Sequence, residues 1–221
     1  MVVFIITLSG FGLHQAWYFG LASFHNYSVI NVLKHWQNSP LQHNQKEYLR
    51  IKVKAQQAVL YHPHHAEYWD LKAQVNEWGF ILGYEKHVGA LLEVKKQYLR
   101  ATELRPLWPD TWASLIKLKW RLQEFDQEMF YYFEQATVLG PQKPKVHLAV
   151  VELGLALYSN NHPMLLNIRP EFYRRLALGL RHAKTRGRVR KLIAQYESQA
   201  LVCRWLKNED LKTRKLIPKC T

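Results

Sequence analysis

The chain has 221 residues, 48% of them hydrophobic, with 8 Trp, 12 Tyr and 9 Phe, so it is too apolar and too aromatic for a disordered protein. Two cysteines, Cys203 and Cys220, are too few for a disulfide framework or a four-cysteine zinc site, and ten glycines without a phosphate-cradling run argue against a nucleotide-binding enzyme. The formal net charge of +14 is concentrated in residues 165–221, which hold 15 Lys and Arg against 4 acidic residues. A partner attracted by positive charge should therefore meet the C-terminal quarter.

The N-terminal segment is strongly apolar, because residues 2–24 contain no Lys, Arg, Asp or Glu. A helix of this length would cross a bilayer core of about 30 Å, so we predict a transmembrane anchor over 1–27 and a linker over 28–45. A cleaved signal peptide and a buried core helix are the alternatives. Lys34, the first basic residue, favours a cytoplasmic body by the positive-inside rule.

A short pattern recurs three times in the middle of the chain: an alanine, four further residues, a proline, and a ring six residues after the proline. A proline interrupts one helix and suits the first turn of the next, while an alanine one turn earlier lets neighbouring helices approach closely. The three copies are Ala58, Pro63 and Trp69; Ala101, Pro106 and Trp112; and Ala136, Pro141 and His147.

This pattern is typical of the tetratricopeptide repeat, a helical hairpin of 34 residues. The match is degenerate. Ile116 stands where the consensus has a helix-packing glycine, and Asn76 and Lys119 stand where it has a tyrosine. The first repeat is also about nine residues too long. We predict an all-α fold, with tetratricopeptide-like repeats over 46–163 and basic C-terminal helices over 164–221 that cap the solenoid. Apolar periodicity places helices over 46–61, 66–83, 87–104, 109–123, 126–139, 143–159, 165–183 and 187–207.

Few residues suggest catalysis or metal binding. His62, His64, His65 and Glu67 are zinc-ligand types, but they flank Pro63 and fit a solvated turn between two helices. The acidic residues on the predicted helices fit helix surfaces better than a paired-carboxylate site. We therefore expect no catalytic residue, no metal and no cofactor. The acidic residues considered are Glu67, Asp70, Glu77, Glu85, Asp110 and Glu124.

Basic residues cluster between Arg169 and Lys191, interleaved with leucine and valine, which predicts amphipathic helices with one basic face. Such a face fits anionic lipid, an acidic glycan or protein, or nucleic acid, and of these nucleic acid suits a membrane-anchored chain least. It also fits a solvated outer surface of the terminal helices. The predicted anionic-partner patch comprises Arg174, Arg175, Arg181, Lys184, Arg186, Arg188, Arg190 and Lys191.

A helical solenoid also offers a groove that binds peptide segments or partner helices. Exposed rings are the usual anchors at such surfaces, and Trp78, Trp108 and Trp120 are the candidates, although each also fits a core position.

Several of these residues resemble one family. The stretch HAEYWDLKAQVNEWG at 65–79, the stretch YLRATELRP at 98–106 and the stretch WPDTW at 108–112 resemble the VpsP family of bacterial polysaccharide-biosynthesis proteins. The resemblance covers roughly residues 45–160 and implies an N-terminal membrane segment, a tetratricopeptide-like body on the periplasmic side of the inner membrane, and a role in exopolysaccharide or surface-polysaccharide production. It implies no enzymatic residue.

We therefore expect a membrane-anchored scaffold that binds protein components of a polysaccharide synthesis and export complex. One alternative is a polysaccharide-modifying enzyme that uses Glu67, Asp70 or Glu77. The other is a cytoplasmic binder of nucleic acid or anionic lipid that uses the basic C-terminal helices.

Overall fold

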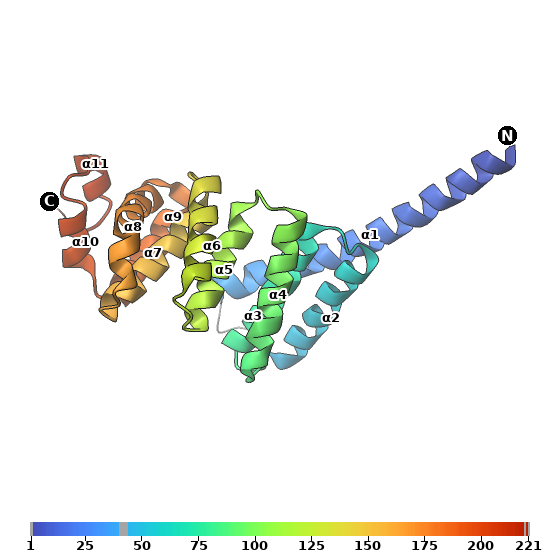
Figure 1. Cartoon of the computed structure of the whole chain (residues 1–221), viewed down its shortest axis with the longest axis horizontal. Coiled ribbons are helices and arrows are strands. Elements are labelled where there is room, and N and C mark those ends of the chain that lie inside the picture. The colour runs from blue at the N-terminus through green and yellow to red at the C-terminus, as the bar shows by residue number, and fades with distance from the viewer. Residues whose placement is uncertain (1, 40–43, 219, 221) are drawn as a thin grey trace. The chain divides into compact units, whose positions relative to one another are not determined.

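The computed structural model describes residues 2–39, 44–218 and 220, and in this part of the chain every regular element is a helix (Figure 1). The prediction of an all-α fold is confirmed. The chain divides into two compact units, Met1–Pro106 and Leu107–Thr221, which are described separately.

The first unit consists of two long helical hairpins. Helix α1 packs against α2 and α3, α2 packs against α3, and α3 packs against α4. Its main core joins Val29, Leu33 and Trp36 to Tyr48 and other apolar residues of α2 and α3. The helices are α1 (Val2–Asn38), α2 (Gln45–Tyr61), α3 (Ala66–Ile81) and α4 (Val88–Leu104).

Helix α1 corrects the prediction of a membrane anchor. Among the residues that the structure describes, no helix is long and apolar enough to cross a membrane, so the transmembrane segment over 1–27 and the single-pass inner-membrane location are wrong. Instead of ending near residue 27, α1 continues to Asn38. From Ala22 onward one face of α1, with Val29, Leu33 and Trp36, is buried against α2 and α3. The expected linker over 28–45 is thus helical as far as Asn38, and its residues 40–43 lie outside the described part.

Local sequence signals fix where α2 begins. Asn44 is the N-cap, and its side chain accepts a hydrogen bond from the backbone N–H of Glu47 at 2.8 Å. The Glu47 carboxylate in turn accepts a 2.9 Å hydrogen bond from the indole of Trp36, which ties α2 to α1. An Asn cap with Glu three residues later is the capping-box arrangement that starts helices.

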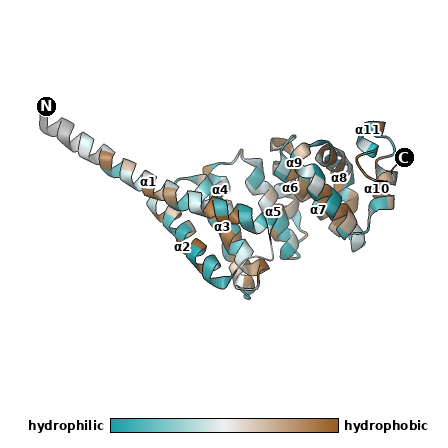
Figure 2. Cartoon of the chain, turned by 180° about the vertical axis from the view of Figure 1, so that it is seen from behind, coloured by the Kyte–Doolittle hydropathy of each residue, from teal (hydrophilic) through white to brown (hydrophobic). Residues whose placement is uncertain are grey.

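The second unit is built around α7, which packs against α5, α8 and α9. Hydrophobic residues are concentrated on α7 (Figure 2), where Gly154 lies so close to the ring of Phe172 of α8 that a side chain would overlap it. The helices are α5 (Pro109–Arg121), α6 (Gln127–Leu139), α7 (Pro144–Ser159), α8 (Met164–Arg181), α9 (Ala183–Gln195), α10 (Gln199–Trp205) and α11 (Leu211–Arg214).

The three Ala–x4–Pro turns share one backbone geometry. Ala58, Ala101 and Ala136 are each at most 2% exposed, and each carbonyl accepts the backbone N–H four residues later at 3.0–3.1 Å. In each copy the residue seven positions after the alanine is extended, with φ between −80° and −97° and ψ between 102° and 124°, and caps the next helix. The sequence pattern therefore corresponds to one turn geometry, which occurs at residues 58–65, 101–108 and 136–143.

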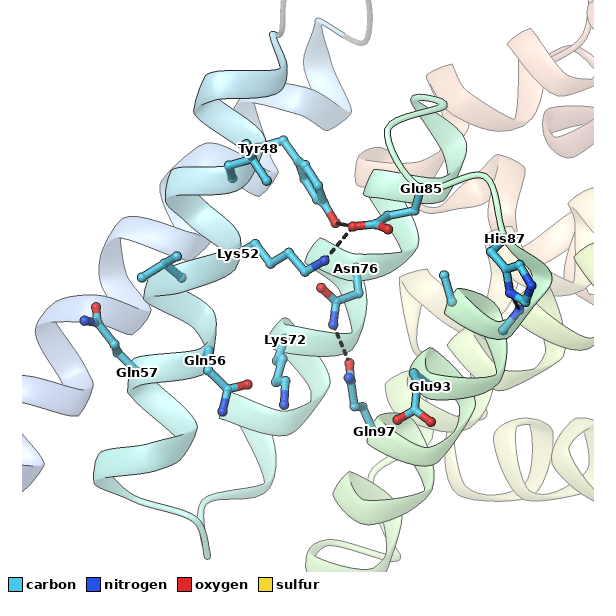
Figure 3. A pocket seen from close by; sticks show the side chains of 14 residues that line it. Tyr48, Lys52, Gln56, Gln57, Lys72, Asn76, Glu85, His87, Glu93 and Gln97 are labelled. Carbon is cyan, nitrogen blue, oxygen red and sulfur yellow. Dashed lines mark hydrogen bonds and ion pairs between the residues drawn. The ribbon is translucent and has the colours of Figure 1, made fainter.

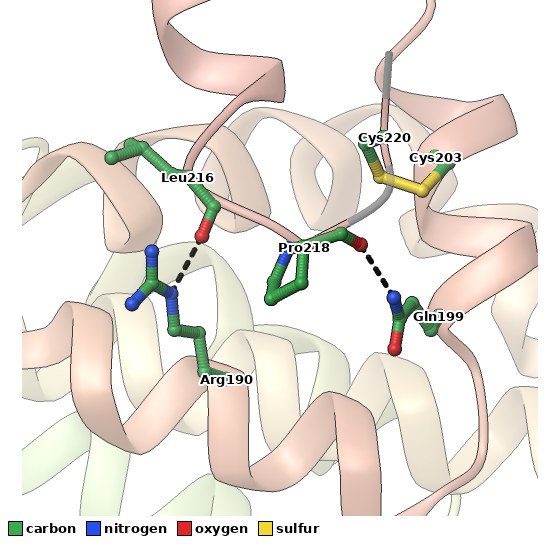
Figure 4. The surroundings of a disulfide bond; sticks show 6 residues. All are labelled: Arg190, Gln199, Cys203, Leu216, Pro218 and Cys220. Carbon is green, nitrogen blue, oxygen red and sulfur yellow. Dashed lines mark hydrogen bonds between the residues drawn. A yellow bond between two sulfur atoms is a disulfide. The ribbon is translucent and has the colours of Figure 1, made fainter.

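The two cysteines are bonded to each other (Figure 4). Cys203 of α10 and Cys220 lie 5.2 Å apart between their Cα atoms and form a disulfide. The tail is also held by side chains: Arg190 donates to the carbonyl of Leu216 at 2.6 Å, and Gln199 donates to the carbonyl of Pro218 at 2.5 Å. A count of two cysteines excludes a disulfide framework but did not lead us to predict this single bond.

Candidate functional site

A groove of about 790 Å³ opens between α2 and α4 in the first unit, with α3 as its floor (Figure 3). This volume is in the range of small-molecule and peptide sites. Figure 3 shows polar side chains from all three helices facing the space. The lining residues are Tyr48, Leu49, Lys52, Val53, Gln56, Gln57, Lys72, Asn76, Glu85, His87, Gly89, Ala90, Glu93 and Gln97.

One end of the groove is closed by a charged cluster that satisfies itself. Glu85, from the loop between α3 and α4, accepts hydrogen bonds from Lys52 at 2.5 Å and from the hydroxyl of Tyr48 at 2.9 Å. The hydrogen bond from Lys52 holds the pKa of Glu85 below its ordinary value, so this carboxylate stays ionised and paired. Gly79 permits the arrangement, because a side chain at this position would overlap the Tyr48 ring.

The floor of the groove carries a pair of carboxamides. Asn76 of α3 donates to the side-chain oxygen of Gln97 of α4 at 2.9 Å, and Gln97 is only 8% exposed. The side-chain oxygen of Asn76 is buried and accepts no hydrogen bond from any described residue. The NH₂ group of Gln97 likewise has no partner in the described chain. The pair therefore presents an unused acceptor beside an unused donor.

Lys72 adds a positive charge to the same floor. Its ammonium lies 4.9 Å from the centre of the Trp69 ring, a cation–π distance. Burial lowers the pKa of Lys72, and Glu93 on the opposite wall partly offsets this effect. Glu93 itself is paired with Lys96 at 2.6 Å. With Lys52 and Glu85 also paired, the groove carries no large net charge.

Sequence reasoning missed the groove, although two departures from the repeat consensus point to it. In the predicted repeat, Asn76 stands where the consensus carries tyrosine, so the sequence has a small amide there in place of a ring. The length of the first predicted repeat is the second signal. Helices α3 and α4 have 16 and 17 residues, whereas α5 and α6 have 13 each. The additional turns lengthen the floor and one wall of the groove.

The three candidate tryptophans are partly buried, and each has a neighbour. Trp78 packs against the first-unit core, with its ring 6.0 Å from that of Trp36. Trp108 caps α5 and lies 4.4 Å beneath the ammonium of Lys143. Trp120 lines a second, smaller pocket of about 540 Å³ in the second unit. None of the three lines the groove between α2 and α4.

Arg175, a member of the predicted anionic-partner patch, is inside the second unit and its side chain is 0% exposed. Its guanidinium donates to the carbonyls of Thr137 and Gly140 at 2.7 Å and to the carboxylate of Glu171 at 2.5 Å. These carbonyls belong to the end of α6, where helices leave four acceptors unpaired. Arg175 therefore stabilises a helix terminus and is not available to an external anion.

Four other members of the patch, three of them exposed and Arg186 partly buried, are engaged within the chain. Arg174 forms two 2.7 Å hydrogen bonds with Glu171, and Arg181 bonds to Thr213 and Glu209. Arg186 donates to the carbonyls of Leu180 and Arg181 at the end of α8, and Arg190 holds the tail.

The remaining members, Lys184, Arg188 and Lys191, are exposed and have no partner among the described residues. Their spacing of four and three residues places them on one face of α9. The predicted patch of eight cations is thus reduced to a row of three.

His147, buried beside Arg175, gives the second unit a pH dependence. Burial, with the nearby charge of Arg175, lowers its pKa to about 4, although the Glu171 carboxylate opposes the effect. Because the unfolded histidine binds a proton near pH 6.5 and the folded one does not, stability should fall as the pH drops from 6.5 to 4, by roughly 3 kcal/mol. Urea unfolding at several pH values measures this loss.

The matched variant is His147→Asn, which keeps an acceptor near the position of the Nδ1 atom but does not titrate. It should remove most of the loss between pH 6.5 and 4. A small slope should remain, because burial also lowers the pKa of His25 and of His62 in the first unit. Equal slopes in the variant and the unmodified chain would contradict this role for His147.

Two of the three carboxylates proposed for the enzyme alternative have structural partners. Asp70 accepts from Gln74 at 2.7 Å, and Glu77, which is 8% exposed, accepts from the hydroxyl of Tyr98 at 2.7 Å. Glu67 is exposed in the first turn of α3. None of the three lines the groove.

A different acidic cluster surrounds Lys119, whose side chain is 1% exposed. Its ammonium lies 2.5 Å from Glu124, 2.6 Å from Asp126 and 2.9 Å from Glu128. Within the described residues these are the carboxylates close enough together to hold a metal ion, but the ammonium of Lys119 already bonds to all three. Burial would lower the pKa of Lys119, and hydrogen bonds to the three carboxylates raise it instead.

The histidines around Pro63 pack against other rings. His62 stacks on Phe19 with 4.4 Å between ring centres, and His65 stacks on Tyr68 at 4.1 Å. Both histidines lie in the connection between α2 and α3, as expected for an inter-helix turn.

No family model matches the sequence, and no curated protein matches it significantly. The resemblance to the VpsP family therefore remains a hypothesis that rests on the quoted residues.

Proposed function

We propose that this chain is a non-enzymatic helical-repeat scaffold that binds protein partners in bacterial exopolysaccharide or surface-polysaccharide synthesis and export. The observation that carries the binding role is the groove between α2 and α4, whose floor presents unused hydrogen-bonding groups beside aliphatic walls. Grooves of this composition are typical of recognition sites.

The repeated turn supports a degenerate tetratricopeptide-like solenoid. The same cap hydrogen bond and the same extended residue recur after Ala58, Ala101 and Ala136. Repeat proteins of this kind act through extended surfaces made by stacked hairpins. The longer α3–α4 hairpin would widen the surface at one place along the stack.

The charged groups of the molecule favour binding over catalysis. Glu77 and Asp70 accept hydrogen bonds from neighbouring side chains, and Glu85 is held ionised by Lys52. A general acid needs a carboxyl group whose pKa is raised toward neutrality, and the pKa of Glu85 is shifted the opposite way.

The polysaccharide context comes from the resemblance of residues 65–79, 98–106 and 108–112 to the VpsP family. Residues 65–79 form most of α3, the floor of the groove, and residues 98–106 include the end of α4. The portion of the chain that carries the resemblance therefore also builds part of the candidate site.

Deletion of the gene in its native host tests this proposal. Cells without the protein should make less surface or secreted polysaccharide, and expression of the full chain should restore it. The purified chain, incubated with the polymer, should leave its length and composition unchanged. Unaltered polysaccharide in the deletion strain, or depolymerisation by the purified protein, would refute the proposal.

A further inference from the structure

The Asn76–Gln97 pair has the hydrogen-bonding pattern of a receptor for a peptide backbone. As oriented in the structure, Asn76 offers a free oxygen and Gln97 a free NH₂ group. If nitrogen and oxygen are exchanged in both side chains, Gln97 donates to Asn76 instead. The free groups are then the NH₂ group of Asn76 and the oxygen of Gln97, again one donor and one acceptor. The conclusion is therefore independent of how the two amides are assigned.

An extended residue presents complementary groups. In a strand the N–H and C=O of one residue point to the same side, so that they exchange two hydrogen bonds with a single partner. In a helix these groups are already bonded within the helix. An acceptor and a donor side by side therefore suit an extended segment better than a helical one.

The walls of the groove suit a peptide side chain. Leu49 and Val53, one helical turn apart on α2, are 52% and 57% exposed, and Ala90 of α4 also lines the groove. The face of the Tyr48 ring is covered by Tyr84, at 5.4 Å between ring centres. It is therefore not open for a sugar ring to stack on.

We propose that the groove binds an extended segment of a partner protein through its backbone. The N–H and C=O of one residue meet the Asn76–Gln97 pair, and an aliphatic side chain of the segment packs against Leu49 and Val53. Gln56, whose carboxamide also faces the space between α2 and α4, lies at the edge of the path (Figure 3). This inference rests on the proposed binding function and names the chemistry of the partner.

A displayed library of random twelve-residue peptides, selected on the purified full chain, supplies the probe. Selected peptides should bind the Asn76→Leu/Gln97→Met variant at least about tenfold more weakly, because two hydrogen bonds are lost and the shapes are nearly kept. The matched control is Gln195→Met, an exposed amide on α9 that lies outside the groove. Since Asn76 and Gln97 are partly or fully buried, Val53→Asp at an exposed wall position gives a second test that does not disturb the core.

An N-methyl scan of the best peptide tests the backbone contact itself. Methylation removes one N–H at a time without changing any side chain. Because successive N–H groups of a strand point to opposite sides, the loss of binding should fall on one position or on alternating positions. Loss at every internal position would indicate a helical ligand and overturn the proposal.

The remaining outcomes are also decisive. Peptides that bind both groove variants as well as the unmodified chain, a library that yields no binder, or oligosaccharides that bind in place of peptides would each overturn the inference. If peptides bind as expected but deletion leaves polysaccharide production unchanged, the polysaccharide role fails and the groove inference stands. If polysaccharide production falls but groove variants restore it fully, the inference fails and the polysaccharide role stands.

Discussion

Replacing Arg175 by methionine should destabilise the second unit by about 3–5 kcal/mol, the range for breaking a buried charged network from one side. The guanidinium is 0% exposed and bonds to Thr137, Gly140 and Glu171. Methionine fills similar space but leaves the carbonyls at the end of α6 without donors in a site that water does not reach. Urea unfolding followed by circular dichroism measures the change.

The neighbouring residue provides the control. Arg174→Met removes the same charge from the adjacent position, but Arg174 is 49% exposed and pairs with Glu171 at the surface. Exposed pairs contribute at most about 1 kcal/mol, so this variant should unfold almost as the unmodified chain does. A similar loss for both variants would show that charge alone, and not the buried hydrogen bonds, accounts for the effect of Arg175.

Lys119→Met should have the second largest effect, a loss of about 3 kcal/mol at neutral pH. The substitution leaves three carboxylates facing one another without the ammonium that bonds to all three and reduces their repulsion. The carboxylates are 36–52% exposed and can turn toward water, which places the expected loss at the lower end of the range for buried pairs. Thermal and urea unfolding at pH 7 provide the measurement.

The pH dependence separates this mechanism from a simple packing defect. Burial alone would raise the pKa of Asp126, but the hydrogen bonds from Lys119 and from the backbone N–H of Met129, together with the charge of Lys119, lower it in the folded chain. Its stabilising contribution is therefore present above the unfolded pKa near 4 and is lost as the pH falls through the folded pKa. The difference between Lys119→Met and the unmodified chain should shrink at low pH.

Lys117→Met is the matched control for this cluster, because Lys117 forms only one ion pair, with Glu152 at 3.0 Å, and is 30% exposed. We expect a loss of about 1 kcal/mol or less. A difference between Lys119→Met and the unmodified chain that stays constant as the pH falls from 7 to well below 4 would contradict the ionic account.

Helix boundaries were predictable wherever proline or a cap residue marks them. The expected segment 46–61 corresponds to α2 at Gln45–Tyr61, and the expected segment 109–123 to α5 at Pro109–Arg121. In both cases a local signal, Asn44 or Pro109, fixes the first turn independently of distant contacts.

The C-terminal helices were less predictable. One helix was expected over 187–207, but α9 begins at Ala183 and ends at Gln195, and α10 follows from Gln199. The break falls at Glu197, which has a φ of 48°, a left-handed conformation that usually selects glycine or asparagine. Because no turn residue marks this position, helical periodicity alone could not locate it.

The functional residues depended on tertiary contacts that periodicity cannot supply. Arg174 and Arg175 are adjacent in the sequence, and only the packing of α8 against α7 decides which of them is buried. The Asn76–Gln97 pair joins residues 21 positions apart on two helices. The sequence predicted a helical repeat with a binding surface, but the groove between α2 and α4, which we propose as that surface, depends on contacts that only the structure gives.

Site-specific photo-crosslinking in the native host tests the central claim most directly. A photoreactive residue at Leu49, on the groove wall, should form one discrete adduct with a component of polysaccharide synthesis or export. The same residue at Val138, which is 69% exposed on α6 in the second unit, should not form it. No adduct at Leu49, or the same adduct at both positions, would contradict a partner-binding groove in the first unit.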